Sequence, residues 1–158
     1  MPPAEQRDAT KNGNLHRVAL CIARFHSQLA DKLETGARAA LSDAGVTDIE
    51  VLEVPGAFEL PLAAKYAARS GRYAAVVCLG AVIRGETDHY AYVSAEAARG
   101  IQQVQLETEV PCGFGVLTVD TTAQAFERVT GGSKRDTGRQ AVEAVLAARA
   151  VKDSLTAR

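Results

Sequence analysis

The chain has 158 residues, of which 47% are hydrophobic and 23% are charged, and its formal net charge is −1. This length and composition are typical of a globular domain with a sizeable core. The nearly balanced charge and the lack of a basic stripe argue against nucleic acid as a partner. No apolar run approaches the roughly 20 residues that a membrane-spanning helix needs, so we expect no membrane segment.

The N-terminal residues differ from the rest of the chain. Residues 1–16 are polar, include Pro2 and Pro3 and contain no apolar signal core, so we predict a loose arm there. In the remainder, strand-like and helix-like patterns alternate without a linker or a repeat. We therefore predict a single α/β domain over residues 17–158.

Short, continuous apolar runs are typical of strands that are covered on both faces of a parallel sheet. Residues 18–23 form such a run and predict the first strand. Strand-like segments at residues 49–54, which Pro55-Gly56 ends, at 73–79 and at 113–118 predict three more. Apolar positions at three- and four-residue spacing predict helices at residues 27–45, 58–70, 88–107, 120–129 and from 138 onward. Strands separated by helices pair in parallel through right-handed crossovers. The predicted fold is therefore α/β, a three-layer α/β/α sandwich around a four-stranded parallel sheet.

Helix ends carry recognisable signals. Ser27 is the expected N-cap of the first helix, and Gly45 is expected to end it. Pro61 is tolerated because it lies in the first turn of the second helix. Asp120 or Thr121 is expected to cap the short fourth helix.

The cysteines are odd in number, widely spaced and embedded in strand-like runs, at Cys21, Cys78 and Cys112. Metal-ligand spacing is absent, so we expect no metal site. Buried free thiols fit this pattern, and they agree with a reducing cytoplasm as the location.

The third predicted helix is apolar around more than one stripe. Its apolar positions are Tyr90, Tyr92, Val93, Ala95, Ala97, Ala98, Ile101 and Val104. A helix of this kind is usually buried on several sides, and in so short a chain a neighbouring copy is the expected cover. We therefore predict a homo-oligomer.

Polar turns follow the first three predicted strands, at residues 24–26, 54–59 and 80–89. The carboxyl ends of parallel strands meet at one edge of the sheet, where open α/β folds bind ligands. We predict that these three turns line one crevice.

The third turn has the features of an anion site. Gly85, Glu86 and Thr87 precede a helix whose first backbone amides lack carbonyl partners, and the helix dipole favours a phosphate or carboxylate there. The alternative is that Thr87 or Asp88 only caps the helix. His89 lies in the first helical turn, where the dipole disfavours imidazolium, so we expect a neutral ring that can act as a general base. The competing interpretation is a surface histidine without a role.

Three further side chains each allow two interpretations of their role. Phe25 either plugs one end of the core or offers a flat face to a planar ring. Glu59, after the Pro55-Gly56 turn, either complements the helix dipole or accepts hydrogen bonds from the hydroxyls of a polyol. Arg128 is either a mobile anion ligand or a solvated side chain.

Five motifs, in their order along the chain, resemble those of the lumazine synthase family. They read RFH at 24–26, VPGAFE at 54–59, GAVIRGETDH at 80–89, GFGVLT at 113–118 and QAFER at 124–128. The resemblance extends from about residue 17 into the last helix. Several motifs at matching separations argue against a chance match.

The resemblance implies a flavodoxin-like fold and the penultimate step of riboflavin biosynthesis, a transferase reaction. In that step 5-amino-6-(D-ribitylamino)uracil condenses with 3,4-dihydroxy-2-butanone 4-phosphate to 6,7-dimethyl-8-ribityllumazine, phosphate and water. The two small-molecule substrates supply the amine, the ketone and the leaving group, so no cofactor and no metal is expected. The family's sites lie between subunits of a homopentamer, and the polar N-terminal arm favours an isolated pentamer over a larger shell.

By position, the resemblance implies a role for each motif, with His89 as the proton-transfer residue and Phe25 stacked on the pyrimidine ring. The residues implied to bind the ribitylaminouracil are Phe25, Ala57, Phe58, Glu59, Ala81, Val82, Ile83 and, from the neighbouring subunit, Phe114. The residues implied to bind the butanone phosphate are Gly85, Glu86, Thr87 and, from the neighbouring subunit, Arg128.

Three positions depart from the family's usual pattern. Asp88 stands where proline is common, Ala91 where an acidic residue is usual, and Thr137 where a phosphate-binding lysine is usual. Lys134 or Arg135 is the candidate replacement for that lysine. These departures motivate an alternative hypothesis, a weakly active or inactive paralogue that acts as a flavin- or lumazine-binding oligomer.

Overall fold

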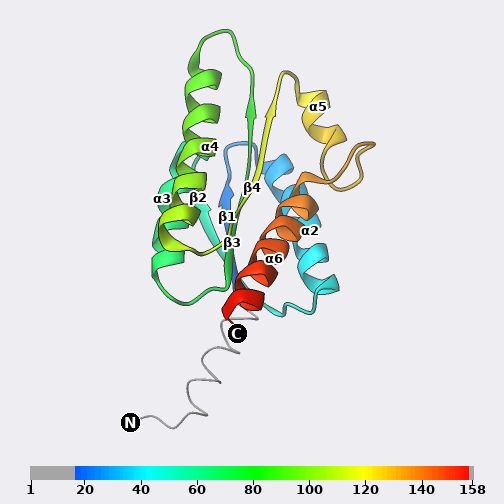
Figure 1. The fold of residues 1–158 in the computed structure, drawn as a ribbon. Helices are drawn as coiled ribbons and strands as arrows, with labels where there is room; N and C mark the ends of the chain where they lie inside the picture. Colours follow the sequence, from blue (N-terminus) through cyan, green and yellow to red (C-terminus); the bar gives the residue numbers. More distant parts are fainter. Residues whose placement is uncertain (1–16, 157–158) are drawn as a thin grey trace.

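The computed structural model describes residues 17–156 as a four-stranded sheet with helices on both faces (Figure 1). All strand pairs are parallel, and the strand order is β2-β1-β3-β4. The predicted α/β/α sandwich is confirmed. The arm predicted over residues 1–16 lies outside the described residues.

The elements follow the predicted order. The strands are β1 (Arg17–Ala23), β2 (Asp48–Val54), β3 (Ala75–Ile83) and β4 (Cys112–Val119). The helices are α2 (Ser27–Asp43), the 3-10 turn η1 (Ala57–Glu59), α3 (Leu60–Arg69), α4 (His89–Thr108), α5 (Thr122–Glu127) and α6 (Thr137–Thr156). Among the described helices, none has the length and apolar character needed to cross a membrane.

The core consists of two apolar layers, one on each face of the sheet. On one face Leu20 of β1 packs with Leu33 of α2 and Val142 of α6. On the other face Cys21 of β1 lies in the same cluster as Leu60 of α3. Neighbouring residues of β1 thus point into different layers, and both are fully buried, which explains the continuous apolar run of this strand.

Glycine allows the helices to approach closely within each layer. A Cβ atom at Gly138 of α6 would lie 2.2 Å from the carbonyl oxygen of Leu33 in α2. A Cβ atom at Gly100 of α4 would lie 2.7 Å from the Cβ atom of Pro61 in α3. Any larger residue at either position would force the paired helices apart.

The three cysteines are buried and free, as predicted. Cys21 and Cys78 are opposite each other in the pairing of β1 with β3. The hydrogen bond with Cys21, together with burial, raises the pKa of the Cys78 thiol. Burial, with a smaller effect of Cys21, raises the pKa of the Cys112 thiol to about 12.

The end of β3 differs from the prediction and shapes the site. The strand was expected at residues 73–79, but it runs to Ile83 because its pairing with β4 continues as far as Ile83 opposite Val119. Pairing of β1 with β3 stops at Ile22 opposite Leu79. The last residues of β3 therefore extend beyond its pairing with β1, at the carboxyl edge of the sheet. This leaves open space beside them on the β1 side.

Helix ends were predicted with mixed success. The hydroxyl oxygen of Thr121 accepts a hydrogen bond from the backbone N–H of Gln124 at 3.1 Å, so the predicted cap of α5 is confirmed. Gly45 follows α2 with a φ of 78°, a conformation that favours glycine. The prediction for Ser27 was wrong, because this residue is the first of α2 and the N-cap is His26, which forms no side-chain capping bond.

Candidate functional site

A pocket of about 510 Å³ lies at the carboxyl ends of β1, β2 and β3. Its lining comes from the turns that follow β1 and β2, from the last residues of β3 and from the first turns of α4. The lining residues are Phe25, His26, Gly56, Ala57, Phe58, Glu59, Ala81, Val82, Ile83, His89, Tyr92 and Val93. The prediction that three separate turns line one crevice is therefore confirmed.

The wall after β1 presents an aromatic ring to the pocket. Phe25 is 79% exposed, so it is not the core plug that was one of its two interpretations. Its ring meets the imidazole of His26 edge to face, with centroids 4.9 Å apart and planes at 85°. The flat face of an exposed phenyl ring can stack on a planar heterocycle.

The wall after β2 combines a tight turn with an acidic side chain. One carboxylate oxygen of Glu59 accepts a hydrogen bond from the backbone N–H of Gly56 at 3.0 Å, which holds the turn together. The other oxygen forms no hydrogen bond within residues 17–156. Glu59 therefore has a structural role, and it retains an acceptor that a bound hydroxyl group can use.

The wall after β3 is the strand end that extends beyond β1. Ala81, Val82 and Ile83 pair with β4 on one side only, and their backbone borders the pocket on the other. An unpaired strand edge offers backbone N–H and C=O groups in a fixed array. Such an edge can bind the polar rim of a planar heterocycle.

The start of α4 places an imidazole beside unpaired backbone donors. The hydroxyl oxygen of Thr87 is 3.4 Å from the backbone nitrogen of His89, a long contact, and Asp88 at the N-cap makes no side-chain capping bond. In the described part of the chain, the backbone N–H groups of Gly85, Glu86 and Thr87 have no hydrogen-bond acceptor. Capping therefore does not use up the donors at this helix start, and they remain able to bind an anion.

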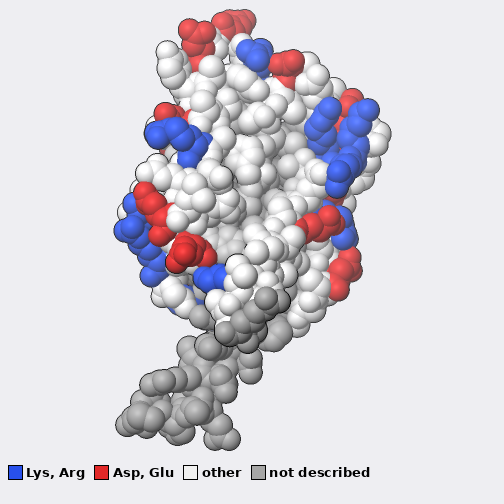
Figure 2. All heavy atoms as spheres, viewed as in Figure 1, with Lys and Arg blue, Asp and Glu red and all other residues white. Residues whose placement is uncertain are grey.

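Five of the sequence-predicted site residues do not line the pocket of their own chain, namely Gly85, Glu86 and Thr87, which precede α4, and Phe114 and Arg128. Phe114 is on β4, 41% exposed, and Arg128 ends α5, where its guanidinium donates to the carbonyl oxygen of Gln124 at 2.9 Å. Figure 2 shows Lys and Arg side chains gathered over the connection between α5 and α6, the segment that carries Arg128, Lys134 and Arg135. The structure therefore joins eight of the thirteen predicted residues in one cavity, and it leaves these five outside the lining.

Four lining residues were not among the predicted site residues, namely His26 and Gly56, which lie in two of the turns predicted to line the crevice, and Tyr92 and Val93. Tyr92 and Val93 lie three and four positions after His89, which places them on the same face of α4. Their helical spacing is the signal that could have identified them. His26 forms part of the pocket wall, and partial burial lowers the pKa of its imidazole.

The donor set of the described residues gives no metal centre. Within residues 17–156, no three His, Cys, Asp or Glu side chains are grouped so that they could hold a metal ion. The pocket instead combines apolar and aromatic walls, one imidazole, one carboxylate and backbone donors. This arrangement suits an organic ligand that has a planar ring and hydroxyl groups.

The sequence of this chain is similar to a family model and to several proteins that share one name. The sequence model of the 6,7-dimethyl-8-ribityllumazine synthase family matches residues 16–153. A protein of that name from Kineococcus radiotolerans is 52% identical over 136 residues, which cover 85% of this chain and 84% of that protein. Proteins of the same name from Desulfatibacillum aliphaticivorans and Salinibacter ruber are 45% and 43% identical, over 92% of this chain and 97% and 93% of theirs. On this evidence the chain belongs to the 6,7-dimethyl-8-ribityllumazine synthase family.

Proposed function

We propose that this chain catalyses the condensation of 5-amino-6-(D-ribitylamino)uracil with 3,4-dihydroxy-2-butanone 4-phosphate to 6,7-dimethyl-8-ribityllumazine, phosphate and water. The observation that carries this proposal is one cavity that combines an exposed phenyl ring, an imidazole and a carboxylate. Family membership supports the choice of substrates.

The pyrimidine substrate occupies the part of the pocket between the first three strand ends. Its ring stacks on Phe25, and its polar edge meets the backbone of Ala81, Val82 and Ile83. The ribityl chain extends along the turn that carries Ala57, Phe58 and Glu59. The free carboxylate oxygen of Glu59 accepts a hydrogen bond from one ribityl hydroxyl group.

The phosphate-bearing substrate lies at the start of α4. The unpaired backbone N–H groups of Gly85, Glu86 and Thr87 donate to its phosphate oxygens, and the helix dipole adds to this attraction. His89 follows directly on the same turn, so its imidazole lies where it can move a proton between the two reactants.

The reaction requires no further chemical groups from the protein. An amine condenses with a ketone by losing water, and phosphate is already a good leaving group. Holding two reactants together can lower a barrier by about 7–11 kcal/mol, whereas general acid–base help contributes roughly 10²–10⁴-fold. Proximity is therefore the larger effect, and His89 is secondary to it.

We further propose a homopentamer in which Phe114 and Arg128 complete the pocket of the neighbouring subunit. Large apolar side chains on α3 and α4 support association, because Leu62, Tyr66 and Leu106 are each more than half exposed. The face seen in Figure 2 also carries few charged side chains along its centre, over β4. Sedimentation velocity tests this proposal, and a monomer or a shell-sized particle would contradict it.

The three free thiols support a cytoplasmic location, which we also propose. A fusion to a fluorescent protein in the native host tests this directly. Fluorescence confined to the cell envelope would contradict it.

The decisive experiment is a two-substrate assay with purified protein. We expect the absorbance of the lumazine product to rise much faster than in a protein-free blank. A rate equal to the blank would refute the proposed function. If such a protein still bound lumazine or flavin, the paralogue suggested by Asp88, Ala91 and Thr137 would be the correct interpretation.

A further inference from the structure

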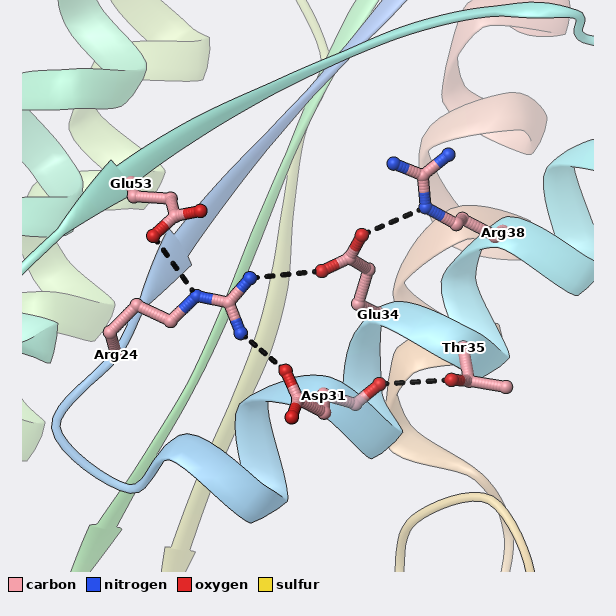
Figure 3. Close-up of polar contacts among 6 residues, drawn as sticks. All are labelled: Arg24, Asp31, Glu34, Thr35, Arg38 and Glu53. Carbon is pink, nitrogen blue, oxygen red and sulfur yellow. Dashed lines mark hydrogen bonds and ion pairs between the residues drawn. The ribbon is translucent and has the colours of Figure 1, made fainter.

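Arg24 is the first residue after β1, and its side chain is held by three carboxylates (Figure 3). One terminal nitrogen of the guanidinium is 2.6 Å from Asp31, and the other is 3.1 Å from Glu34. The Nε atom is 3.3 Å from Glu53. All nitrogen atoms of one guanidinium therefore have an acidic partner.

These partners come from two separate elements of the fold. Asp31 and Glu34 lie on α2, and Glu53 lies on β2, next to the last residue of that strand. The backbone N–H of Arg24 also donates to the carbonyl oxygen of Val54 at 3.0 Å. Arg24 thus connects the turn that carries Phe25 with the strand end that leads into the second pocket wall.

The guanidinium is committed to these contacts and does not line the pocket. Its side chain is 27% exposed. Burial by itself lowers the pKa of Arg24, but the hydrogen bonds with Asp31 and Glu53 outweigh it, so the net pKa is raised. Arg24 is therefore permanently charged and already paired, which argues against a direct role as an anion ligand.

We propose that Arg24 is a positioning residue for the heterocycle: it fixes the Phe25 turn relative to the end of β2, and thereby holds the ring of Phe25 where the pyrimidine stacks. This inference rests on the proposed function, because it concerns the ring-binding part of the same pocket.

Few contacts within residues 17–156 hold the side chain of Phe25 in place. Its ring is largely exposed, and its aromatic contact within residues 17–156 is the neighbouring His26. The placement of the ring is therefore set by the backbone of the turn rather than by packing. A planar guanidinium with several donors can bridge three carboxylates, whereas the compact ammonium of lysine cannot reproduce this geometry. Removing the guanidinium would also leave three carboxylates close together without their shared cation.

Arg17 supplies a matched control at the opposite end of the same strand pair. Its Nε atom is 2.7 Å from Asp48, so it too links β1 to β2 by an ion pair. Arg17 pairs opposite Asp48 at the first position of the β1–β2 register, whereas the pocket lies beyond the last. A substitution there removes a comparable ion pair without touching the pocket.

The experiment measures the dissociation constant of 5-amino-6-(D-ribitylamino)uracil by titration calorimetry on Arg24→Met, Arg24→Lys and Arg17→Met. We expect Arg24→Met to weaken binding roughly tenfold, within the range that loss of a stacking contact costs. Arg24→Lys should weaken it by less, and Arg17→Met by less than about twofold, as for an ordinary surface substitution. The KM for the butanone phosphate should change little in either Arg24 variant, which a general loss of structure would not produce.

Glu53→Gln guards against unfolding of the Arg24 variants, since it removes only the charge opposite the Nε atom of Arg24 and leaves the ion pairs with Asp31 and Glu34 in place. It should raise the dissociation constant in the same direction as Arg24→Lys. An unchanged dissociation constant for the pyrimidine in folded Arg24→Lys and Glu53→Gln proteins would overturn the inference. An equal loss of affinity for both substrates would overturn it as well. A wild-type protein that binds the pyrimidine but makes no lumazine would refute the proposed function alone, and one that binds no pyrimidine would refute both.

Discussion

Replacement of Phe25 by alanine separates binding from stability more cleanly than any other change in the pocket. The side chain is 79% exposed, so about one fifth of its area is buried in the folded chain. Full burial of a phenylalanine contributes about 1.5–3 kcal/mol, so the buried fifth contributes about 0.3–0.6 kcal/mol. The edge-to-face contact with His26 adds about 0.5–1.5 kcal/mol. We therefore expect the free energy of unfolding to fall by no more than about 2 kcal/mol.

Binding should respond much more strongly to the same change. Stacking of a base on an aromatic side chain contributes about 1–3 kcal/mol, which corresponds to roughly 5–150-fold in the dissociation constant. Titration calorimetry with the ribitylaminouracil measures this loss, and urea unfolding measures the stability. Leu155→Ala is a suitable control, because Leu155 is 68% exposed on α6 and does not line the pocket, so both quantities should stay near wild type.

Two results would refute this reasoning. A dissociation constant within about twofold of wild type would mean that no ring stacks on Phe25. A stability loss above about 3 kcal/mol, the range of buried phenylalanines, would mean that the side chain is part of the core after all.

Three further changes test other parts of the argument. His89→Ala should lower kcat by roughly 10²–10⁴-fold yet leave activity measurable above the blank, and complete loss with intact binding would contradict the dominance of proximity. Gly138→Ala should lower the free energy of unfolding by about 1–3 kcal/mol in urea titrations because its Cβ would clash with the carbonyl oxygen of Leu33, whereas Gly85→Ala, with no atom within 4 Å, should change it little. The neutral Cys112 thiol has its ordinary pKa of 9.0 raised to about 12 by burial, so its contribution to stability is complete below pH 9 and is lost as the pH rises from there toward 12. The free energy of unfolding, measured in urea, should therefore decline as the pH rises from 9 toward 12, and it should decline less steeply in Cys112→Ala. Equal pH dependence of the two proteins would be evidence against a raised pKa of the Cys112 thiol.

The sequence allowed the layers and most elements to be predicted, because both rest on local patterns. The continuous apolar run at residues 18–23 identified β1, which is buried on both faces. The edge strand β2 was identified without such a run, because Glu50 and Glu53 interrupt its apolar residues. The end of β3 could not be predicted from the pattern of apolar residues. Its last residues remain in the sheet because β4 continues beside them to Val119, a pairing between segments that the sequence pattern does not reveal.

The site was predictable to the extent that it follows from topology. Turns after parallel strands must meet at one edge, so Phe25, the Gly56 turn and His89 could be placed together without coordinates. Tyr92 and Val93 required the rotational phase of α4, which depends on where that helix begins. The contacts of Arg24 with α2 and β2 could not be predicted, because they depend on how far apart these two elements lie and the sequence carried no signal for that distance.

The same geometry links ligand binding to assembly. The single chain supplies aromatic and backbone surfaces for a planar ring, but Phe114 and the basic segment around Arg128 do not line its own pocket. An exposed phenyl ring on β4 and a cluster of cations beside α5 serve no purpose in that pocket. Both become useful if a second copy places its strand ends against them, because the ring then gains a second apolar wall and the phosphate gains a cation. The exposed apolar residues of α3 and α4 give such a contact its driving force, and Phe114 and Arg128 are the residues through which the site would then be completed.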